Sequence, residues 1–354
     1  MDLWKDILSI FSVLLNGLPQ GLLALSFGFA SVPTAFAFLI GAAGNAITGN
    51  VVPISFQAET ITLAGTMGDN LKERLSMIFY GGLIMTFIGL FGLMSKITDS
   101  IGPVITAGMM AGVGIMLARV SIEMARKNKI IGYVSIASGV ITHLFTKDLV
   151  YTIAVSVIIS SIVYNILGNK KGESFIIERE KIAINKPSFS LKILRGAMSM
   201  VCLNIGANIA FGNITGQLAN RKVNIDQVSI ISSLADMSSS ILGGAPVESI
   251  ISATGGAPNP KASGIIMMLL MAAILFAGFL PKIGKYIPTE SIAGFLFVLG
   301  AIVTAPVNAA SALTSTAANG TVIGGVTMTV TAITDPFIGM ISGLLMKILL
   351  PMIG

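Results

Sequence analysis

The sequence predicts an all-α membrane protein with about fourteen transmembrane segments, arranged as two halves of seven in an inverted repeat. Of the 354 residues, 54% are apolar and only 11% are charged, whereas a soluble domain carries roughly a quarter charged residues. Long stretches hold no charge at all, among them Ser291 to Thr334. Because about 20 apolar residues cross a bilayer, such stretches indicate several crossings.

Polar clusters and Gly/Pro-rich clusters divide the chain into its expected segments. The third and tenth segments are short and contain Pro53 and Pro246. The only long polar connection, Gly168 to Arg195, carries seven Lys or Arg residues and separates the two halves. The expected segments are 7–29, 33–49, 51–67, 75–95, 100–119, 129–146, 149–167, 196–213, 225–242, 245–258, 262–280, 287–304, 308–331 and 335–352.

The composition excludes several classes of function. Cys202 is the only cysteine and His143 the only histidine, so neither an intrachain disulfide nor a cysteine or histidine metal cluster is expected. The net charge of +6 suits contact with anionic lipid headgroups and does not indicate nucleic acid. The start MDLWKD does not resemble a cleavable signal peptide. Enzyme motifs such as H-E-x-x-H are missing. We therefore expect a multi-pass protein of the cell membrane that is not an enzyme and needs no cofactor.

The two halves contain matching interrupted segments. GNVVPISFQAETITLAG in the first half corresponds to GGAPVESIISATGG in the second. In each, an extended piece is expected to lead into a half-helix, whose free N–H groups and positive end then point to the membrane midplane. Because an odd number of crossings turns the second half upside down, the two interrupted segments are expected to meet. Their facing ends predict a site for carbonyl oxygens, ring nitrogens or anionic groups of a solute.

Acidic residues follow both prolines. Glu59 follows Pro53, and Glu248 lies two residues after Pro246. A carboxylate at membrane depth costs about 2.5–3.5 kcal/mol and usually marks a solute or ion path. These acids therefore predict substrate binding or ion coupling, although an acid in the first turn is also ordinary helix-start chemistry.

Uncharged residues complete the candidate set. Phe56 and Gln57 would stack on and hydrogen-bond a flat ring, or serve only in packing; Ser249 and Ser252 are further candidates in the tenth segment. Asn204 and Asn208 are spaced i, i+4 and share one helix face, for a solute or for interhelical hydrogen bonds.

Two aspartates have expected structural roles. Asp236, surrounded by serines, is expected to pair with backbone at the third segment, with ion coupling as the alternative. Asp335, directly before Pro336, is expected to cap the last helix.

Several stretches resemble a known family. The run ADMSSSILGGAPVESIISATGGAPNPKASGIIMMLLMAAILF, followed by IPTESIAGFLFVLGAIV, is similar to the ninth to twelfth segments of the nucleobase–cation symporter-2 family. Its azaguanine-like purine permease branch is nearest, and VPISFQAETITLAG occupies the place of its third segment. The resemblance implies uptake of a nucleobase such as xanthine, hypoxanthine or guanine with H⁺ or Na⁺, and a homodimer.

The resemblance also implies a core domain of residues 1–97 and 196–282, and a gate domain of residues 98–195 and 283–354. Family members have both termini in the cytoplasm, whereas the distribution of Lys and Arg between the loops places both termini outside.

The sequence also departs from this family. Where the family has an acid in the eighth segment, this chain offers Asn204 and Asn208. The acid of the tenth segment usually follows the proline by about six residues, a position held here by Ser252. The leading hypothesis is a nucleobase transporter in which Glu248 and Asn204 contact the base and Phe56 stacks on it. The alternative is an anion or carboxylate transporter of the same fold; a channel or a scaffold subunit is a further possibility.

Overall fold

The computed structural model describes residues 2–167 and 182–353, so part of the linker expected from Gly168 to Arg195 lies outside the described residues. The described chain is mainly helical and contains one two-stranded sheet. Eight of its helices are long and apolar enough to cross a membrane, and three shorter apolar helices have 10–17 residues. The chain is therefore a multi-pass membrane protein, but the expected number of fourteen crossings is not confirmed.

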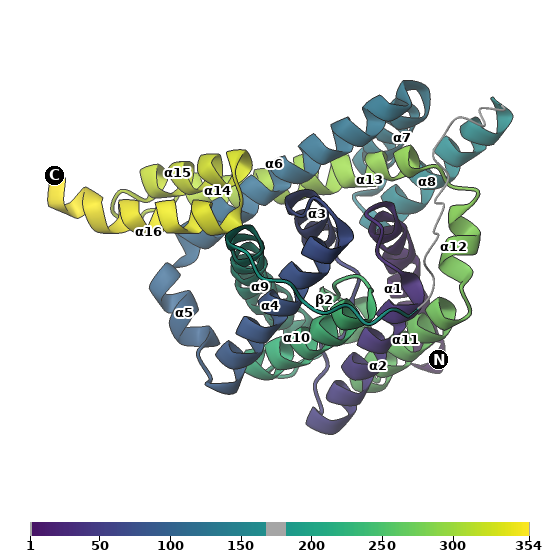
Figure 1. Ribbon diagram of the computed structural model, residues 1–354, viewed down its shortest axis with the longest axis horizontal. Coiled ribbons are helices and arrows are strands. Elements are labelled where there is room, and N and C mark those ends of the chain that lie inside the picture. Colours follow the sequence, from purple (N-terminus) through teal and green to yellow (C-terminus); the bar gives the residue numbers. More distant parts are fainter. Residues whose placement is uncertain (1, 168–181, 354) are drawn as a thin grey trace. The chain divides into compact units, whose positions relative to one another are not determined.

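Figure 1 labels the principal elements. In chain order, the described elements are α1 (Asp2–Ser26), α2 (Ser31–Thr48), β1 (Ile54–Ser55), α3 (Ala58–Met67), α4 (Leu71–Leu90), α5 (Met94–Ile101), α6 (Pro103–Lys127), α7 (Lys129–Thr146), α8 (Leu149–Ile166), α9 (Leu191–Leu218), α10 (Ile225–Leu242), β2 (Glu248–Ser249), the 3₁₀ turn η1 (Ala253–Gly256), α11 (Pro260–Phe276), α12 (Phe279–Gly284), η2 (Thr289–Ile292), α13 (Ala293–Phe297), the π-helical stretch η3 (Val298–Thr304), α14 (Ala305–Leu313), α15 (Gly320–Ile333) and α16 (Pro336–Ile353).

The chain divides into two compact units. Unit 1 contains Met1–Met94, Tyr164–Ala197 and Ala207–Thr289, and unit 2 contains Ser95–Val163, Met198–Gly206 and Glu290–Gly354. Helix α9 contributes to both units. The assignment of a core domain and a gate domain stays a prediction, because nothing in these boundaries reveals a function.

In unit 1, α10 packs against α2 and α4, and α11 packs against α1 and α2 (Figure 1). Small residues permit this close approach: a Cβ added to Gly82 would lie 2.8 Å from the backbone oxygen of Ser233. The start of α2 is also joined to the end of α10, since the N–H of Ala30 donates to the carbonyl of Gly243 over 3.0 Å. The packing of α2 on α10 therefore positions both chain breaks.

In unit 2, α6 packs against α14, α15 and α16 (Figure 1). The expected twelfth segment ends at residue 304, but the helix continues and one apolar span covers Thr289–Leu313. This boundary was wrong because Pro306 suggests a helix break. The π-helical stretch η3 directly precedes this proline, and such local adjustments accommodate a residue without an N–H inside a membrane helix. The next helix then begins at Gly320.

Asp335 confirms one structural prediction in unit 2. Its Oδ1 accepts hydrogen bonds from the backbone N–H groups of Phe337 and Ile338, both over 3.0 Å, and from the hydroxyl of Ser199 over 2.7 Å. The carboxyl group thus satisfies free N–H groups at the start of α16.

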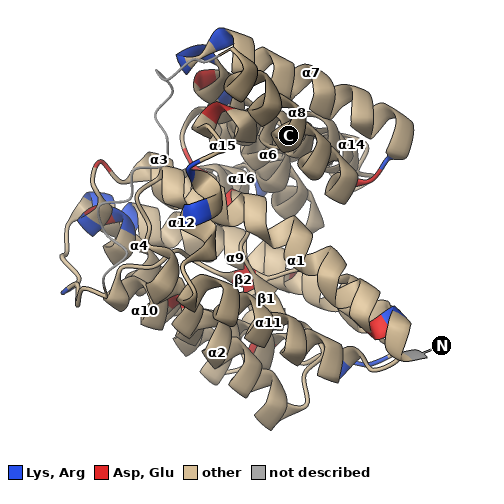
Figure 2. Ribbon diagram, turned by 90° about the vertical axis from the view of Figure 1, so that its right-hand side faces the viewer, with Lys and Arg blue, Asp and Glu red and all other residues tan. Residues whose placement is uncertain are grey.

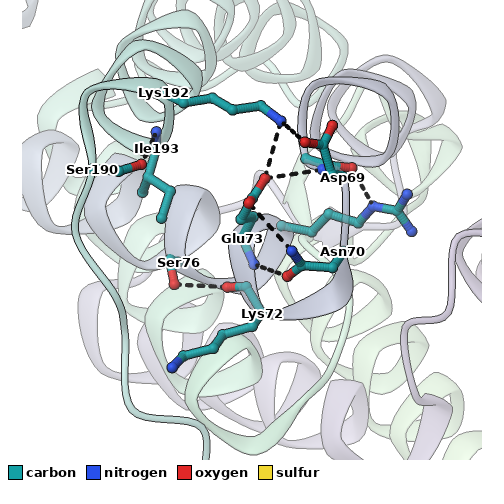
Figure 3. A network of polar contacts seen from close by, with 10 residues as sticks. Asp69, Asn70, Lys72, Glu73, Ser76, Ser190, Lys192 and Ile193 are labelled. Carbon is teal, nitrogen blue, oxygen red and sulfur yellow. Dashed lines mark hydrogen bonds and ion pairs between the residues drawn. The ribbon is translucent and has the colours of Figure 1, made fainter.

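Basic residues lie mainly near the ends of the helices. Figure 2 shows Lys and Arg gathered mainly at helix ends and connections. Ion pairs of one such lysine connect the start of α9 to the start of α4 in unit 1 (Figure 3). The ammonium of Lys192 lies 2.5 Å from the carboxylate of Asp69 and 3.1 Å from that of Glu73. Asn70 caps α4 by accepting a hydrogen bond from the N–H of Glu73.

Candidate functional site

The two interrupted segments meet within unit 1. Strands β1 and β2 pair antiparallel, with Ile54 opposite Ser249 and Ser55 opposite Glu248. The N–H of Ile250 also donates to the carbonyl of Pro53 over 3.2 Å. This pairing confirms the prediction that the breaks at Pro53 and Pro246 lie together, and it satisfies backbone groups at the place where the helices are interrupted.

The first break runs from β1 into α3, as expected. Glu59 lies in the first turn of this ten-residue helix and is buried. Its carboxyl group lies beside its own backbone N–H. The preceding N–H, that of Ala58, donates to Oε1 of Gln20 on α1 over 2.8 Å. The first N–H of α3 is thus bound by a side-chain oxygen from α1.

Phe56 and Gln57 make contacts within the protein. The Phe56 ring is 1% exposed and packs edge-to-face on Phe38, with 5.4 Å between ring centroids. Oε1 of Gln57 accepts a hydrogen bond from the hydroxyl of Thr60 over 2.7 Å. The observed contacts of both side chains are packing and local capping; the expected contact with a solute stays a prediction.

The second break differs from the expectation. No half-helix follows β2: the chain forms only the four-residue turn η1 before α11 begins. Glu248 therefore lies in a strand and not in the first turn of a helix. Gly255, Gly256, Pro258 and Pro260 explain the difference, because closely spaced glycines and prolines disfavour a continuous helix. The predicted pair of facing helix ends is reduced to one, that of α3.

Two carboxyl groups lie together at the second break. Asp236 on α10 and Glu248 on β2 are each 1% exposed, and their side chains share a hydrogen bond. Such a bond requires one proton between the two carboxyl groups. Oδ1 of Asp236 also accepts from the N–H of Val247 over 2.7 Å. Asp236 thus bonds backbone, as predicted, but at the tenth segment and not at the third.

Amide and hydroxyl side chains hold the same strand. Asn208 on α9 donates to the hydroxyl of Ser229 over 3.1 Å and accepts from that of Ser249. The hydroxyl of Ser252 bonds that of Thr254 over 2.7 Å. Asn204, four residues before Asn208 on α9, belongs to unit 2 and is buried there.

Two residues of this site escaped the sequence analysis. Gln20 binds the start of α3. Thr215 donates to the carbonyl of Ile250 over 3.0 Å and accepts from the N–H of Ser252 over 3.2 Å. Each is a single polar residue within a long helix, and no local pattern reveals partners 38 or 35 residues away. These partners depend on how the helices pack, which the local sequence does not encode.

The buried charged residues described in unit 1 all carry acidic side chains. They are Asp6, Glu59, Asp236 and Glu248, and no Lys or Arg among the described residues is fully buried. No group of three or more His, Cys, Asp or Glu residues that could hold a metal ion occurs in the described ranges. The hydroxyl of Ser55, in β1, is buried without a hydrogen-bond partner. The site thus combines neutral donors with acids and contains no permanent positive charge.

Comparison with known proteins identifies the fold. No protein-family model matches the chain, and no curated protein matches its sequence. The transmembrane domain of the cyanobacterial bicarbonate transporter BicA is similar in structure, with a TM-score of 0.69 at 13% identity, over 97% of this chain and 98% of that domain. The murine anion transporter Slc26a9, in an inward-facing state, gives 0.70 at 13% identity over 99% of this chain. A further SLC26A9 structure gives 0.61 at 13% identity over 96%.

These similarities correct the resemblance drawn from the sequence. The chain spans 68% and 65% of the two SLC26A9 chains. The similar structures are anion transporters of the SLC26/SulP family, which is distinct from the nucleobase–cation symporter-2 family, so the assignment to the latter is wrong. The matching stretches consist largely of Gly, Ala, Ser and aliphatic residues, which membrane helices of many families share. At 13% identity the comparisons establish a fold, and the similar structures are membrane transporters.

Proposed function

We propose that this chain is a secondary transporter for a small anion, such as an inorganic oxyanion or a carboxylate, and that its transport is coupled to a cation. The likeness in fold to the membrane domain of a bicarbonate transporter, over nearly the whole of both chains, carries this proposal. It favours the anion hypothesis over the nucleobase hypothesis. Purine-specific roles, such as stacking on Phe56, are therefore not retained.

The first break supports anion binding. Helix α3 begins inside unit 1, and its N–H groups point along the helix axis toward the strand pair. Anions bind at such helix starts because the N–H groups donate hydrogen bonds and the helix dipole favours negative charge. The buried hydroxyl of Ser55 is one more donor close to the same chain break. An anion binding there would be held by neutral donors.

Glu59 belongs to this same helix start. Its carboxyl group lies beside a backbone N–H in the first turn of α3. A substrate anion would use the same group of donors and would be repelled by this charge. Binding of the substrate therefore requires Glu59 to turn away or to be neutralised by a cation.

The second break supports cation coupling. Asp236 and Glu248 are buried together, and the described residues of unit 1 include no buried Lys or Arg. An anion entering beside ionised carboxylates would meet strong repulsion in a medium of low dielectric constant. A proton or Na⁺ bound by these acids removes the repulsion, so the cation and the anion would cross together. Asp236 and Glu248 are the proposed coupling residues, and Glu59 would control access of the anion to the start of α3.

The same proposal includes the finer architecture expected from the sequence. Unit 1 would act as the core domain that carries the solute, and unit 2 as the gate domain. The two interrupted segments would occupy equivalent positions in a seven-plus-seven inverted repeat, an arrangement that recurs in transporters with alternating access. Asn208, Ser249 and Ser252 would then hold β2 in place and position the acids, without contacting the solute.

Uptake by the purified chain in proteoliposomes tests the choice of solute. Labelled bicarbonate, sulfate, chloride, a dicarboxylate and hypoxanthine would each be offered outside vesicles that are preloaded with the same unlabelled solute. We expect exchange of at least one anion and none of hypoxanthine. Glu123→Gln, on an exposed residue of unit 2, is the matched control for acidic substitutions. Exchange of the base alone, or of no anion by correctly folded protein, would contradict the proposal.

A further inference from the structure

A second charged site lies at one end of unit 1, apart from the paired breaks. A cleft of about 310 Å³ opens where α11 begins. Arg221, from the connection between α9 and α10, and Lys261, from the first turn of α11, contribute its cationic groups. Ala262 and Ile265 contribute apolar wall. The cleft therefore joins two positive side chains to an apolar surface.

Contacts around the cleft place it at the membrane boundary. Asn259, which lines it, donates from its backbone N–H and its side chain to the carboxylate of Asp6, near the start of α1. The Lys261 ammonium donates to the carbonyl of Ala46, near the end of α2. Several helix ends thus gather there, and Trp4 on α1 is exposed nearby in sequence. Exposed tryptophan is typical of the interface between lipid and water.

The positive charges of the cleft are available to a ligand. Within residues 2–167 and 182–353, the Arg221 side chain forms no ion pair and no hydrogen bond. Lys261 uses one of its three donors on Ala46. The N-terminus of α11 itself is already occupied by Asp6, which also accepts from Ser263 over 2.7 Å. Binding of an anionic group in the cleft therefore depends on the two side chains, whose combined charge exceeds that of Asp6.

The apolar wall continues along the outside of α11. Ile266, Leu269 and Leu270 follow Ala262 and Ile265 on this helix and are exposed, which in a membrane helix means contact with lipid. A free inorganic anion would use only the charged part of this surface. A molecule with an anionic head and a hydrocarbon chain would use both parts.

We propose that this cleft binds the headgroup of an anionic phospholipid, with an acyl chain lying along the exposed face of α11. Arg221 contacts the phosphate through its planar group of donors, and Lys261 adds a second positive charge. The site is separate from the solute site, because its residues make no contact with β1, β2 or α3 in the interactions described above. A lipid bound there fastens the α9–α10 connection to the start of α11.

Native mass spectrometry of the purified full chain tests this proposal. The protein would be titrated with phosphatidylglycerol and, separately, with phosphatidylcholine. We expect phosphatidylglycerol to bind more tightly, and the double variant Arg221→Gln/Lys261→Gln to bind it about thirty-fold more weakly, since each basic residue at a membrane surface contributes roughly a factor of five. Arg221→Lys/Lys261→Arg keeps both charges and should retain most of the affinity.

The double variant Lys282→Gln/Lys285→Gln is the matched control, because it removes two charges from the α12 region of unit 1. It should bind phosphatidylglycerol like the wild type. Equal losses in both double variants would overturn the proposal, because they would indicate a general charge effect. Displacement of the lipid by millimolar inorganic phosphate would also overturn it, because the ligand would then be the free anion. Thermal unfolding in detergent checks that every variant is folded.

Discussion

The two chain breaks of unit 1 pair with each other through β1 and β2, yet they are built differently. The first leads from β1 into the ten-residue helix α3, whereas the second leads from β2 into the four-residue turn η1. The sequence after β1 has no glycine or proline before Gly65, but the sequence after β2 soon reaches Gly255 and Gly256. A helix start with its N–H groups exists only at the first break.

Their polar groups differ in the same way. The first break offers neutral donors and a single acid, Glu59, while the second holds the carboxyl pair of Asp236 and Glu248. The comparison suggests that the two breaks have different roles in transport. The first break would bind the anion, and the second would bind the coupling cation. Substitutions at the two breaks should therefore have different consequences for transport.

The largest effect is expected at the second break, from Asp236→Ala. This change removes the acceptor of the Val247 N–H and leaves Glu248 without its carboxyl neighbour. We expect coupled uptake to be lost and the free energy of unfolding to fall by about 1–3 kcal/mol, the usual cost of an unsatisfied buried group. Uptake in proteoliposomes and chemical denaturation measure the two effects.

Asp236→Asn separates these effects, because its amide oxygen still accepts the Val247 N–H but the side chain cannot exchange a proton. Stability near that of the wild type, together with loss of coupling, is the expected result. Normal coupling in both Asp236 variants would remove this residue from the mechanism.

A smaller effect, of opposite sign, is expected at the first break from Glu59→Gln. A charge at a helix N-terminus contributes about 0.3–1 kcal/mol, so removing a competing carboxylate should tighten anion binding about twofold to fivefold. The concentration for half-maximal exchange measures this change. Weaker binding would mean that Glu59 supports the anion, and the proposed competition at α3 would then be wrong.

Gln20→Ala should affect transport less. It frees the N–H of Ala58, and we expect a loss of about 1 kcal/mol in the free energy of unfolding. A bound anion can satisfy the freed N–H, so the transported anion should raise the unfolding temperature of this variant more than that of the wild type. Gln227→Ala, on an exposed residue of α10, serves as the control. An equal anion response in all three proteins would contradict the role given to α3.

The smallest effect on transport is expected from Thr215→Val. This change removes both hydrogen bonds from Thr215 to the second break, at a cost of about 1–2 kcal/mol in stability. Coupling should nevertheless remain, because Val247 and Asn208 still hold the strand that carries Glu248. Thr48→Val, on an exposed threonine of α2, is the comparison. Loss of coupling in Thr215→Val alone would show that η1 takes part in cation binding.

The sequence was informative where local chemistry decides the structure. Pro53 and Pro246 interrupt apolar segments, and the hydropathy pattern around them was enough to predict that the breaks meet. It was not enough to predict how each break continues, because the glycines near Pro258 outweigh the helix-start pattern around Pro246. The partners of Gln20 and Asp236 depend on packing between α1, α3 and α10, which no local pattern encodes.

The assignment to the nucleobase–cation symporter-2 family was wrong for a related physical reason. Membrane helices of many families contain similar runs of small and aliphatic residues, so the resemblance reflected the composition of membrane helices and not the solute. The proposed site includes neutral donors such as Ser55, which resemble ordinary packing residues in a sequence.

The most direct test of the account is accumulation of the transported anion against its gradient. Proteoliposomes with the wild type and with Glu248→Gln would receive an inward gradient of protons or of Na⁺, and the internal anion would be measured over time. We predict that the wild type accumulates the anion only while a cation gradient exists, and that Glu248→Gln equilibrates the anion without accumulating it. Accumulation by Glu248→Gln equal to that of the wild type would contradict cation coupling at the second break.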